Sequence, residues 1–477
     1  MSDTIQFDSI PESIRKPGKY FEFNTKLAVR TLPANKQKVL IVGQKTASGT
    51  VSPNVPTRVY SDKDAEKYFG AGSICHLMAT AAIKANAYLD LTVAAQDDAG
   101  AGVAASSTVT VTGPATGSGA VTVFIGAQKI EVAVANADTA ASIASAIVTQ
   151  AGKQPSLPVT ASSAAGVVTL TVKNKGLCGN QIGVGYQLTN APGVAIVIVG
   201  MSGGAIDPAL DAALSAVFAG HYDIVITPYN NQTDLLALKN HLDAVSGPLE
   251  QRPGIGVYGV NGAMSDATTL AGQVNAGRIL PAYLRYTSTR NKSMPCEIAS
   301  AVGAVMALEE DPARPLNTLE LKGITPPDVE DRLSRTEQES LLWNGVTPLE
   351  VGSGETVIIV RAISSYTKDA AGIDDIAFLD ITTIRTLDYV RKACRDRIAL
   401  RFPREKLSTK TPAKVKAELL DVLLQLEQLE IVENVRANKD GLIVTKSLQD
   451  PNRLDAKIPA DIVNGLHVFA GRIDLLL

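Results

Sequence analysis

The chain holds one glycine pattern that could bind a nucleotide and one that resembles a phosphate loop. Gly254-Ile-Gly-Val-Tyr-Gly259 matches G-x-G-x-x-G, which cradles a pyrophosphate where a strand turns into a helix. These glycines fall inside a predicted strand, and no acidic residue ends a strand about 20 residues later. Gly43-Gln-Lys-Thr-Ala-Ser-Gly49 lacks the terminal Lys and Ser/Thr of a phosphate loop. We therefore expect a packed strand and an ordinary loop, and keep a nucleotide-dependent α/β enzyme only as an alternative.

The other reactive side chains are scattered. The histidines and cysteines are His76, His221, His241, His467, Cys75, Cys178, Cys296 and Cys394. None of their spacings is that of a zinc site or a disulfide framework, and the neighbours Cys75 and His76 point apart on a helix. Acidic neighbours such as Glu309-Glu310 and Asp374-Asp375 do not face one another either. We expect no catalytic, cofactor-binding or metal-binding residue, and synthesis in a reducing compartment.

A basic segment is the strongest chemical signal. Between Arg385 and Lys416 there are eleven basic and three acidic residues, a balance of +8 in a chain of net charge -3. Apolar residues recur three and four positions apart, which predicts a helix with one buried face. These residues are Ile384, Leu387, Val390, Cys394 and Ile398, while Arg385, Arg391, Lys392 and Arg395 fall on another face. Such a face is either simply solvated or bound to an acidic partner. Nucleic acid is not expected, because no aromatic residues are interleaved and the overall pI is near 5.9.

An alternating α/β pattern surrounds these residues and predicts a largely parallel sheet covered on both faces. We expect strands over 38–43, 89–95, 222–227, 254–260 and 278–286. We expect helices over 61–70, 73–88, 207–219, 231–245, 265–275 and 295–308. Asp207-Pro208 has the form of an N-cap followed by proline at the first helical position. We assign 31–98 and 200–349 to this α/β domain.

Residues 99–199 differ abruptly in composition. They contain six charged residues and are rich in Ala, Gly, Ser, Thr and Val. Low-complexity disorder is one interpretation, but alternating Val and Thr favour a folded β-rich insertion. Strands are expected over 108–112, 121–125, 129–134, 167–172 and 194–199, with a helix over 139–149 capped by Asp138. A variant that joins Gln96 to Gly200 should therefore still fold.

The remaining chain forms a C-terminal domain over 350–461 and two terminal arms, 1–30 and 462–477. The C-terminal domain has a strand over 355–363, the basic helix, a helix over 412–434 and a strand over 441–446. The arms carry apolar strands without local partners, over 20–24 and 466–475. These strands pair either within their own chain or with a neighbouring subunit by strand addition. The chain shows neither a signal peptide nor a run of 18 apolar residues, so we expect no membrane insertion.

Four segments carry a family resemblance. They are Asp311-Pro-Ala-Arg-Pro315, Asp331-Arg332 to Glu337, Arg361 to Tyr366, and Leu379 to Arg391; Pro327-Asp-Val-Glu-Asp-Arg332 and Gly345-Val346 accompany them. In this order the segments resemble the tail sheath proteins of contractile-tail phages of the Mu type. The C-terminal half carries the most specific match, and the Gly/Ala/Thr-rich part resembles these proteins only in its general composition.

The resemblance implies a structural protein without a catalytic site. It implies an α/β sheath core with an inserted β-rich outer domain, an inner C-terminal domain, and arms that extend to other subunits. Sheath proteins form stacked hexameric rings around a tail tube and shorten to drive the tube through a cell envelope. The implied partners are other copies of the chain, the tail tube protein, and baseplate and tail terminator proteins. The location is then the virion, after assembly in the host cytoplasm. A sheath of an R-type bacteriocin or secretion device is the alternative.

Two sets of residues take roles from this resemblance. Arg391, Lys392 and Arg395 are expected to face the tube. The residues expected to take part in strand exchange between subunits are Tyr20, Phe21, Phe23, Leu466, Val468, Phe469, Ile473 and Leu475.

Overall fold

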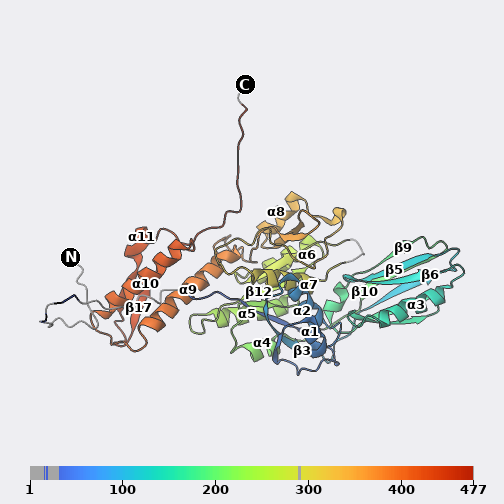
Figure 1. The fold of residues 1–477 in the computed structure, drawn as a ribbon, viewed down its shortest axis with the longest axis horizontal. Coiled ribbons are helices and arrows are strands. Elements are labelled where there is room, and N and C mark those ends of the chain that lie inside the picture. The colour runs from blue at the N-terminus through green and yellow to red at the C-terminus, as the bar shows by residue number, and fades with distance from the viewer. Residues whose placement is uncertain (1–15, 17, 20–31, 288–291, 476–477) are drawn as a thin grey trace. The chain divides into compact units, whose positions relative to one another are not determined.

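The computed structural model describes residues 16, 18–19, 32–287 and 292–475. The chain divides into two compact units. The larger unit comprises Asn35–Tyr389 with Ile462–Leu477, and the smaller unit comprises Met1–Ala34 with Val390–Asp461. Figure 1 shows the elements in chain order.

An eight-stranded sheet forms the centre of the larger unit. Its order is β15-β14-β13-β12-β11-β1-β3-β2. The six strands from β14 to β3 run parallel, and the edge strands β15 and β2 are antiparallel. The strands are β1 (Lys38–Gln44), β2 (Pro56–Val59), β3 (Asp90–Gln96), β11 (Ile224–Ile226), β12 (Ile255–Val260), β13 (Ile279–Tyr283), β14 (Thr347–Val351) and β15 (Val357–Ile359). The central strands are buried on both faces, as a parallel sheet between helices requires.

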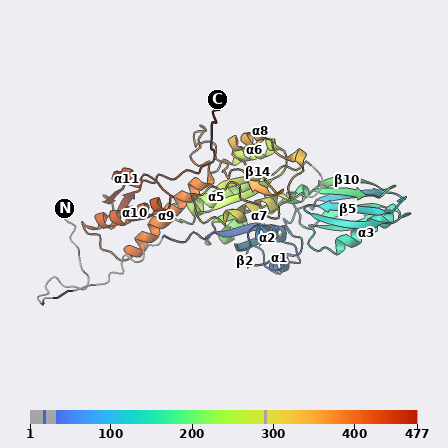
Figure 2. The same cartoon turned by 45° about the horizontal axis from the view of Figure 1, so that its top comes forward.

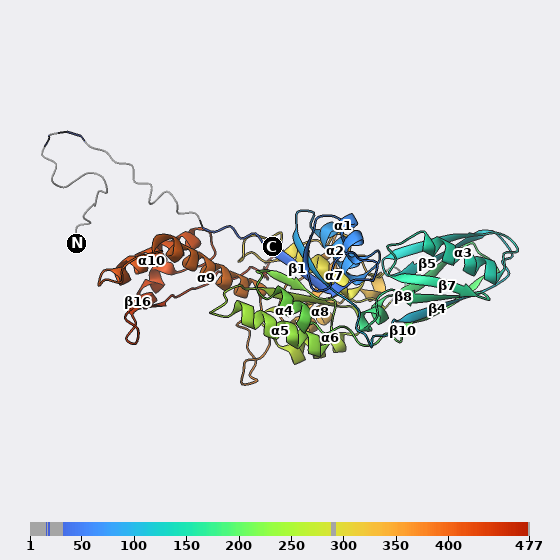
Figure 3. The same ribbon diagram turned by 90° about the horizontal axis from the view of Figure 1, so that it is seen from below.

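Helices cover both faces of this sheet (Figure 3). One layer contains α1 (Asp62–Phe69), α2 (Ile74–Ala85) and α7 (Pro295–Met306). The other contains α4 (Asp211–Val217), α5 (Gln232–Ser246) and α6 (Met264–Val274). The helix α8 (Arg335–Trp343) follows the 3-10 turn Val329–Asp331 and packs against β14 (Figure 2). Ser61, Ser73 and Asn231 cap α1, α2 and α5 with side-chain oxygens.

Two predicted caps are wrong. Asp207 does not open α4, because that helix starts at Asp211. The carboxylate of Asp207 instead accepts a hydrogen bond from the amide of Leu177 at 2.7 Å. In the insertion, Thr139 caps α3, and Asp138 accepts from the amide of Ala135. In both cases an Asp shortly before the helix satisfies a different backbone donor.

The inserted segment forms two antiparallel sheets and one helix. One sheet has the order β10-β4-β8-β7 and the other β6-β5-β9. Their bounds are β4 (Ser106–Thr112), β5 (Gly119–Ile125), β6 (Gln128–Val134), α3 (Ala140–Gly152), β7 (Val159–Ala164), β8 (Val167–Val172), a 3-10 turn (Leu177–Gln181), β9 (Val184–Thr189) and β10 (Ala195–Ser202). The prediction of a folded β-rich insertion is confirmed. However, β10 pairs with β4 inside the insertion and does not return to the large sheet.

The structure moves the boundary suitable for excision toward the C-terminus. A bridge pairs Val103 with Ala205, so the ladder of the insertion continues past Gly200. The side-chain amide of Gln96 donates to the carbonyl of Ala209 at 2.7 Å, which brings these two positions together. We propose residues 97–208 as the unit that can be removed.

Replacing residues 97–208 by a short Gly/Ser linker should leave a soluble, folded protein. The deletion removes hydrogen bonds between the insertion and the α/β part of the unit. Among them, Asn174 accepts from the amide of Ile74 and donates to the carbonyl of Lys45. Each such bond contributes about 1 kcal/mol net, and water can replace it after excision. Circular dichroism and a thermal melt check this. The matched deletion that joins Gln96 to Gly200 leaves an unpaired strand end and should be less stable; an insoluble 97–208 deletion would refute the proposed boundary.

The smaller unit is helical with one hairpin. It holds the second half of α9 (Ile381–Arg401), then α10 (Thr411–Gln428), α11 (Val435–Asn438), a 3-10 turn (Lys439–Gly441) and the strands β16 (Ile443–Lys446) and β17 (Leu454–Lys457). The helix expected over 412–434 is α10, which ends earlier, at Gln428. Its apolar residues Val415, Leu419, Val422 and Leu426 are buried, and Leu429, directly after its end, is exposed. The expected α/β sheet and β-rich insertion are thus confirmed. Over the described residues, no helix is both long and apolar enough to cross a membrane.

Candidate functional site

The glycines of the nucleotide-like pattern are packing positions in β12 and directly before it. A Cβ atom on Gly254 would lie 2.7 Å from the carbonyl oxygen of Tyr222, and one on Gly256 would lie 2.8 Å from Leu238. A Cβ on Gly259 would lie 1.9 Å from the carbonyl oxygen of Pro295, at the start of α7. The motif therefore lets helices and neighbouring backbone approach the strand, and it does not open a helix toward a phosphate.

The histidine and cysteine side chains do not assemble a reactive site. Nδ1 of His76 accepts from the amide of Gly72 at 3.0 Å, and its Nε2 lies 3.3 Å from Asp62. Cys75 is buried, which raises the pKa of its thiol. Within the parts of the chain that the structure describes, no three His, Cys, Asp or Glu side chains are placed to hold a metal ion.

The first half of α9, in the larger unit, contradicts part of the predicted basic face. Arg385 is only 6% exposed and donates to the carbonyl of Glu309 at 2.6 Å. Burial lowers the pKa of its guanidinium to about 10. Asp388 receives two hydrogen bonds from Arg278, at 2.7 and 2.9 Å. This part of the helix is therefore bound to its own unit through charged groups, and Arg385 is not a surface residue.

The second half of α9, in the smaller unit, also uses basic charge internally. Arg397 is 5% exposed and its guanidinium donates to Asp421 at 2.7 Å, to Glu418 at 3.2 Å and to Gln425 at 3.2 Å. Glu418 and Asp421 lie just beyond Lys416, the end of the segment whose charge was counted. The +8 balance is therefore partly neutralised by the next helix, α10.

The three residues expected to face a tube lie where α9 enters the smaller unit. Lys392 donates from Nζ to the carbonyl of Ala34 at 2.8 Å, and Arg395 donates to Asp396 at 3.1 Å. Arg391 and Lys392 are partly buried, and Arg395 is exposed. The partner of Lys392 is an uncharged carbonyl, so this contact does not neutralise the ammonium group. The role of these residues toward a tube stays a prediction.

The C-terminal segment exposes its apolar side chains. Residues 463–475 contain no helix or strand. The exposed fractions are 78% for Leu466 and Val468, 86% for Phe469, 98% for Ile473 and 81% for Leu475. Five large apolar side chains are thus exposed on this segment, and their part in strand exchange stays a prediction. Tyr20, Phe21 and Phe23 lie outside the described residues.

Residues of the segments that carried the resemblance form ion pairs and hydrogen bonds within the larger unit. Arg285 binds Glu337 at 2.5 Å, and the hydrogen bond lowers the pKa of that carboxyl to about 2. Asp331 is buried and accepts from the amide of Thr287 at 2.8 Å. Arg361 binds Asp380, immediately before α9, at 2.7 and 2.9 Å. These motif residues hold loops together, and none of them forms a catalytic arrangement.

This architecture is that of contractile sheath proteins. The fold is similar to the crystal structure of a sheath tail protein from Desulfitobacterium hafniense, with a TM-score of 0.52 at 14% identity over 94% of this chain and 97% of that one. It is also similar to the helical sheath of the anti-feeding prophage in its contracted state, with a TM-score of 0.50 at 12% identity over 97% and 99% of the two chains.

Sequence comparison gives the family. Residues 203–365 match the phage tail sheath protein central domain, and residues 374–475 match the phage tail sheath C-terminal domain. The chain is 32% identical to the Mu-like prophage FluMu tail sheath protein of Haemophilus influenzae, over 99% of this chain and all of that protein. The chain therefore belongs to the phage tail sheath protein family and is a structural protomer of a contractile sheath. The resemblance drawn from its sequence is confirmed.

Proposed function

We propose that the chain polymerises as stacked hexameric rings around a tail tube and contracts to drive that tube through the host envelope. The full-length similarity to the Mu-like prophage tail sheath protein is the observation that carries this proposal. A baseplate protein at one end and a tail terminator protein at the other complete the set of partners. The protein acts in the virion after assembly in the host cytoplasm, and it catalyses no reaction.

The mechanism follows from a bistable assembly. Each protomer exchanges one set of subunit contacts for another, and small gains summed over many protomers supply the work of contraction. The exposed apolar C-terminal segment supports strand exchange, which keeps subunits connected while they move. Negative-stain microscopy of the purified protein tests the proposal directly: tubes or rings are expected, and a monomer under all assembly conditions would contradict it.

A second candidate is the sheath of a bacterial contractile device other than a phage. The fold is shared with contracted sheaths of the anti-feeding prophage and of an extracellular contractile injection system. Genes for tail tube and baseplate without genes for a capsid, beside the gene for this chain, would favour that candidate. A nucleotide-dependent enzyme is not supported, because the glycines of β12 are occupied by packing.

Reversing the charges of Arg391, Lys392 and Arg395 to Glu should abolish co-assembly with the tail tube and leave polymerisation of the sheath alone intact. A single exposed ion pair contributes about 0–1 kcal/mol, but the three charges recur on every protomer along the tube. Co-sedimentation with tube protein, read beside electron microscopy, measures the effect.

The matched control reverses Arg404, Lys406 and Lys410, which are exposed residues of the same basic segment. This triple variant should still co-assemble with the tube. A thermal melt must show that both variants are folded, because Lys392 also contacts Ala34. Normal tube binding by the first variant, or equal loss in both, would show that these three residues do not form the tube-facing site.

A further inference from the structure

One side chain fastens the C-terminal segment to its own protomer. His467 is 14% exposed, although Leu466 and Val468 on either side of it are 78% exposed. The alternation is that of an extended chain which presents every second side chain to the same surface. The apolar neighbours therefore point to solvent, and the polar residue between them points into the protein.

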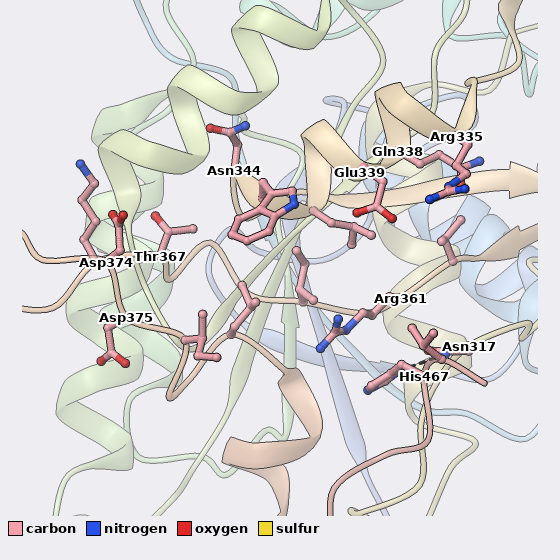
Figure 4. Close-up of a pocket in the computed structure, with 18 residues that line it drawn as sticks. Asn317, Arg335, Gln338, Glu339, Asn344, Arg361, Thr367, Asp374, Asp375 and His467 are labelled. Carbon is pink, nitrogen blue, oxygen red and sulfur yellow. Dashed lines mark hydrogen bonds between the residues drawn. The ribbon is translucent and has the colours of Figure 1, made fainter. Parts of the chain in front are cut away.

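Figure 4 shows His467 with Asn317 and Arg361, and these residues form a polar junction together with Asp380. Its Nδ1 lies 3.0 Å from Nδ2 of Asn317, and its Nε2 lies 3.5 Å from Oδ1 of Asp380. Asp380 is itself held by the two hydrogen bonds from Arg361. Burial and the Arg361 charge lower the pKa of His467, so a neutral ring accepts from Asn317 and directs its N–H toward Asp380.

The backbone beside His467 also lies close to the protein. A Cβ on Gly465 would be 2.6 Å from Cγ of Pro315 and 3.0 Å from the ring of His467. Only glycine allows the chain to pass so close to that loop. The segment is thus seated at 465–467 and leaves the surface beyond this point.

A cavity of about 620 Å³ adjoins this junction. His467 and Val468 line it together with Trp343 and Ile376, which are 79% and 76% exposed. Val468, the first residue beyond the junction, therefore shares a cavity with the single tryptophan of the chain.

We infer that His467 is the positioning residue for strand exchange: it fixes the point where the C-terminal segment leaves its protomer, so that only residues 468–477 reach a second copy. This inference rests on the proposed exchange. Ten extended residues span at most about 33 Å, whereas sixteen residues released from Ile462 would span about 53 Å. Contacts at residues 465–467 thus limit how far, and in which direction, the exchanging strand can extend. This limit raises the effective concentration of the strand at one neighbouring subunit.

The junction can be tested in the monomer, because Trp343 can quench a nearby dye. All four native cysteines are buried, so a bimane attached to a Val468→Cys variant reports on this position alone. We expect Trp343 to quench the dye, and we expect loss of quenching on adding His467→Ala or Asn317→Ala. Adding Arg472→Ala, in the same segment but outside the junction, should leave the quenching unchanged. Trp343→Phe must abolish it in every background.

Assembly is then scored with unlabelled His467→Ala protein, which should lose regular tubes at concentrations where the unmodified chain forms them. His467→Gln keeps an N–H for Asp380 and should restore part of the assembly. Unchanged quenching in His467→Ala, or regular tubes at unchanged concentration, would overturn the inference. Truncation at residue 467 tests the exchange separately: if that truncation abolishes tubes while His467→Ala does not, exchange stands and the positioning role fails.

Discussion

Replacing Gly259 by alanine should destabilise the larger unit by about 3 kcal/mol or more, an effect at the upper end for adding one methyl group. The added Cβ would lie 1.9 Å from the carbonyl oxygen of Pro295 and 2.7 Å from its carbonyl carbon. Both atoms belong to the backbone at the first turn of α7, so no side-chain rotation relieves the contact. Either β12 or α7 must shift, although both are buried. A urea titration followed by circular dichroism measures the change.

Gly272→Ala is the matched control for this prediction. Gly272 lies within α6, and a Cβ there would meet no atom within 4 Å. Alanine should therefore stabilise the helix by about 0.5–1 kcal/mol, because it removes the conformational freedom of glycine in the unfolded chain. If Gly259→Ala instead unfolds at the same urea concentration as the unmodified protein, the close packing of β12 on α7 is incorrect.

Local signals predicted the α/β elements well, because the caps and burial patterns lie within a few residues of what they determine. Ser61, Ser73 and Asn231 each cap the helix that follows, and the apolar run after Gln37 is the buried strand β1. The expected strand over 254–260 is likewise present as β12, with Gly256 and Gly259 inside it. Such features need no knowledge of distant parts of the chain.

Features that depend on distant partners could not be predicted in this way. Arg385 is buried because it meets the carbonyl of Glu309, and Arg397 because Glu418 and Asp421 approach from the next helix. On a helical wheel both arginines resemble solvated cations. The three-and-four spacing located α9 correctly, but it could not show that the buried face contains guanidinium groups.

The burial of His467 was equally invisible in the sequence. There it is one of three polar residues in the largely apolar stretch 466–477, and nothing near it suggests Asn317 or Asp380 as a neighbour. Only the structure shows that the apolar residues on either side of His467 are exposed while the histidine itself is largely covered. Arg472 and Asp474 are also polar residues of this terminus, so polarity alone does not distinguish His467.

Deleting residues 466–477 should leave a folded monomer of near-native thermal stability that forms no tubes. In the monomer the apolar side chains of this segment are exposed, so their removal takes little from its core. When a neighbour buries them, each of these side chains contributes about 1.5–3 kcal/mol, so five contribute about 7.5–15 kcal/mol to assembly. Loss of this contribution should therefore abolish tube formation. A melting scan beside negative-stain microscopy separates the two effects.

Deletion of residues 468–477 is the companion variant, because it keeps His467 in contact with Asn317 and Asp380. The two deletions should fail equally in assembly, and any small loss of melting temperature should appear only in the longer deletion. A Phe469→Ser, Ile473→Ser double variant retains the full chain length and should also lose tubes, since it removes apolar area without shortening the segment. A clear drop in the melting temperature of both deleted monomers would show instead that the segment packs within its own chain. Tubes formed without it would show that exchange of this segment does not hold the sheath together.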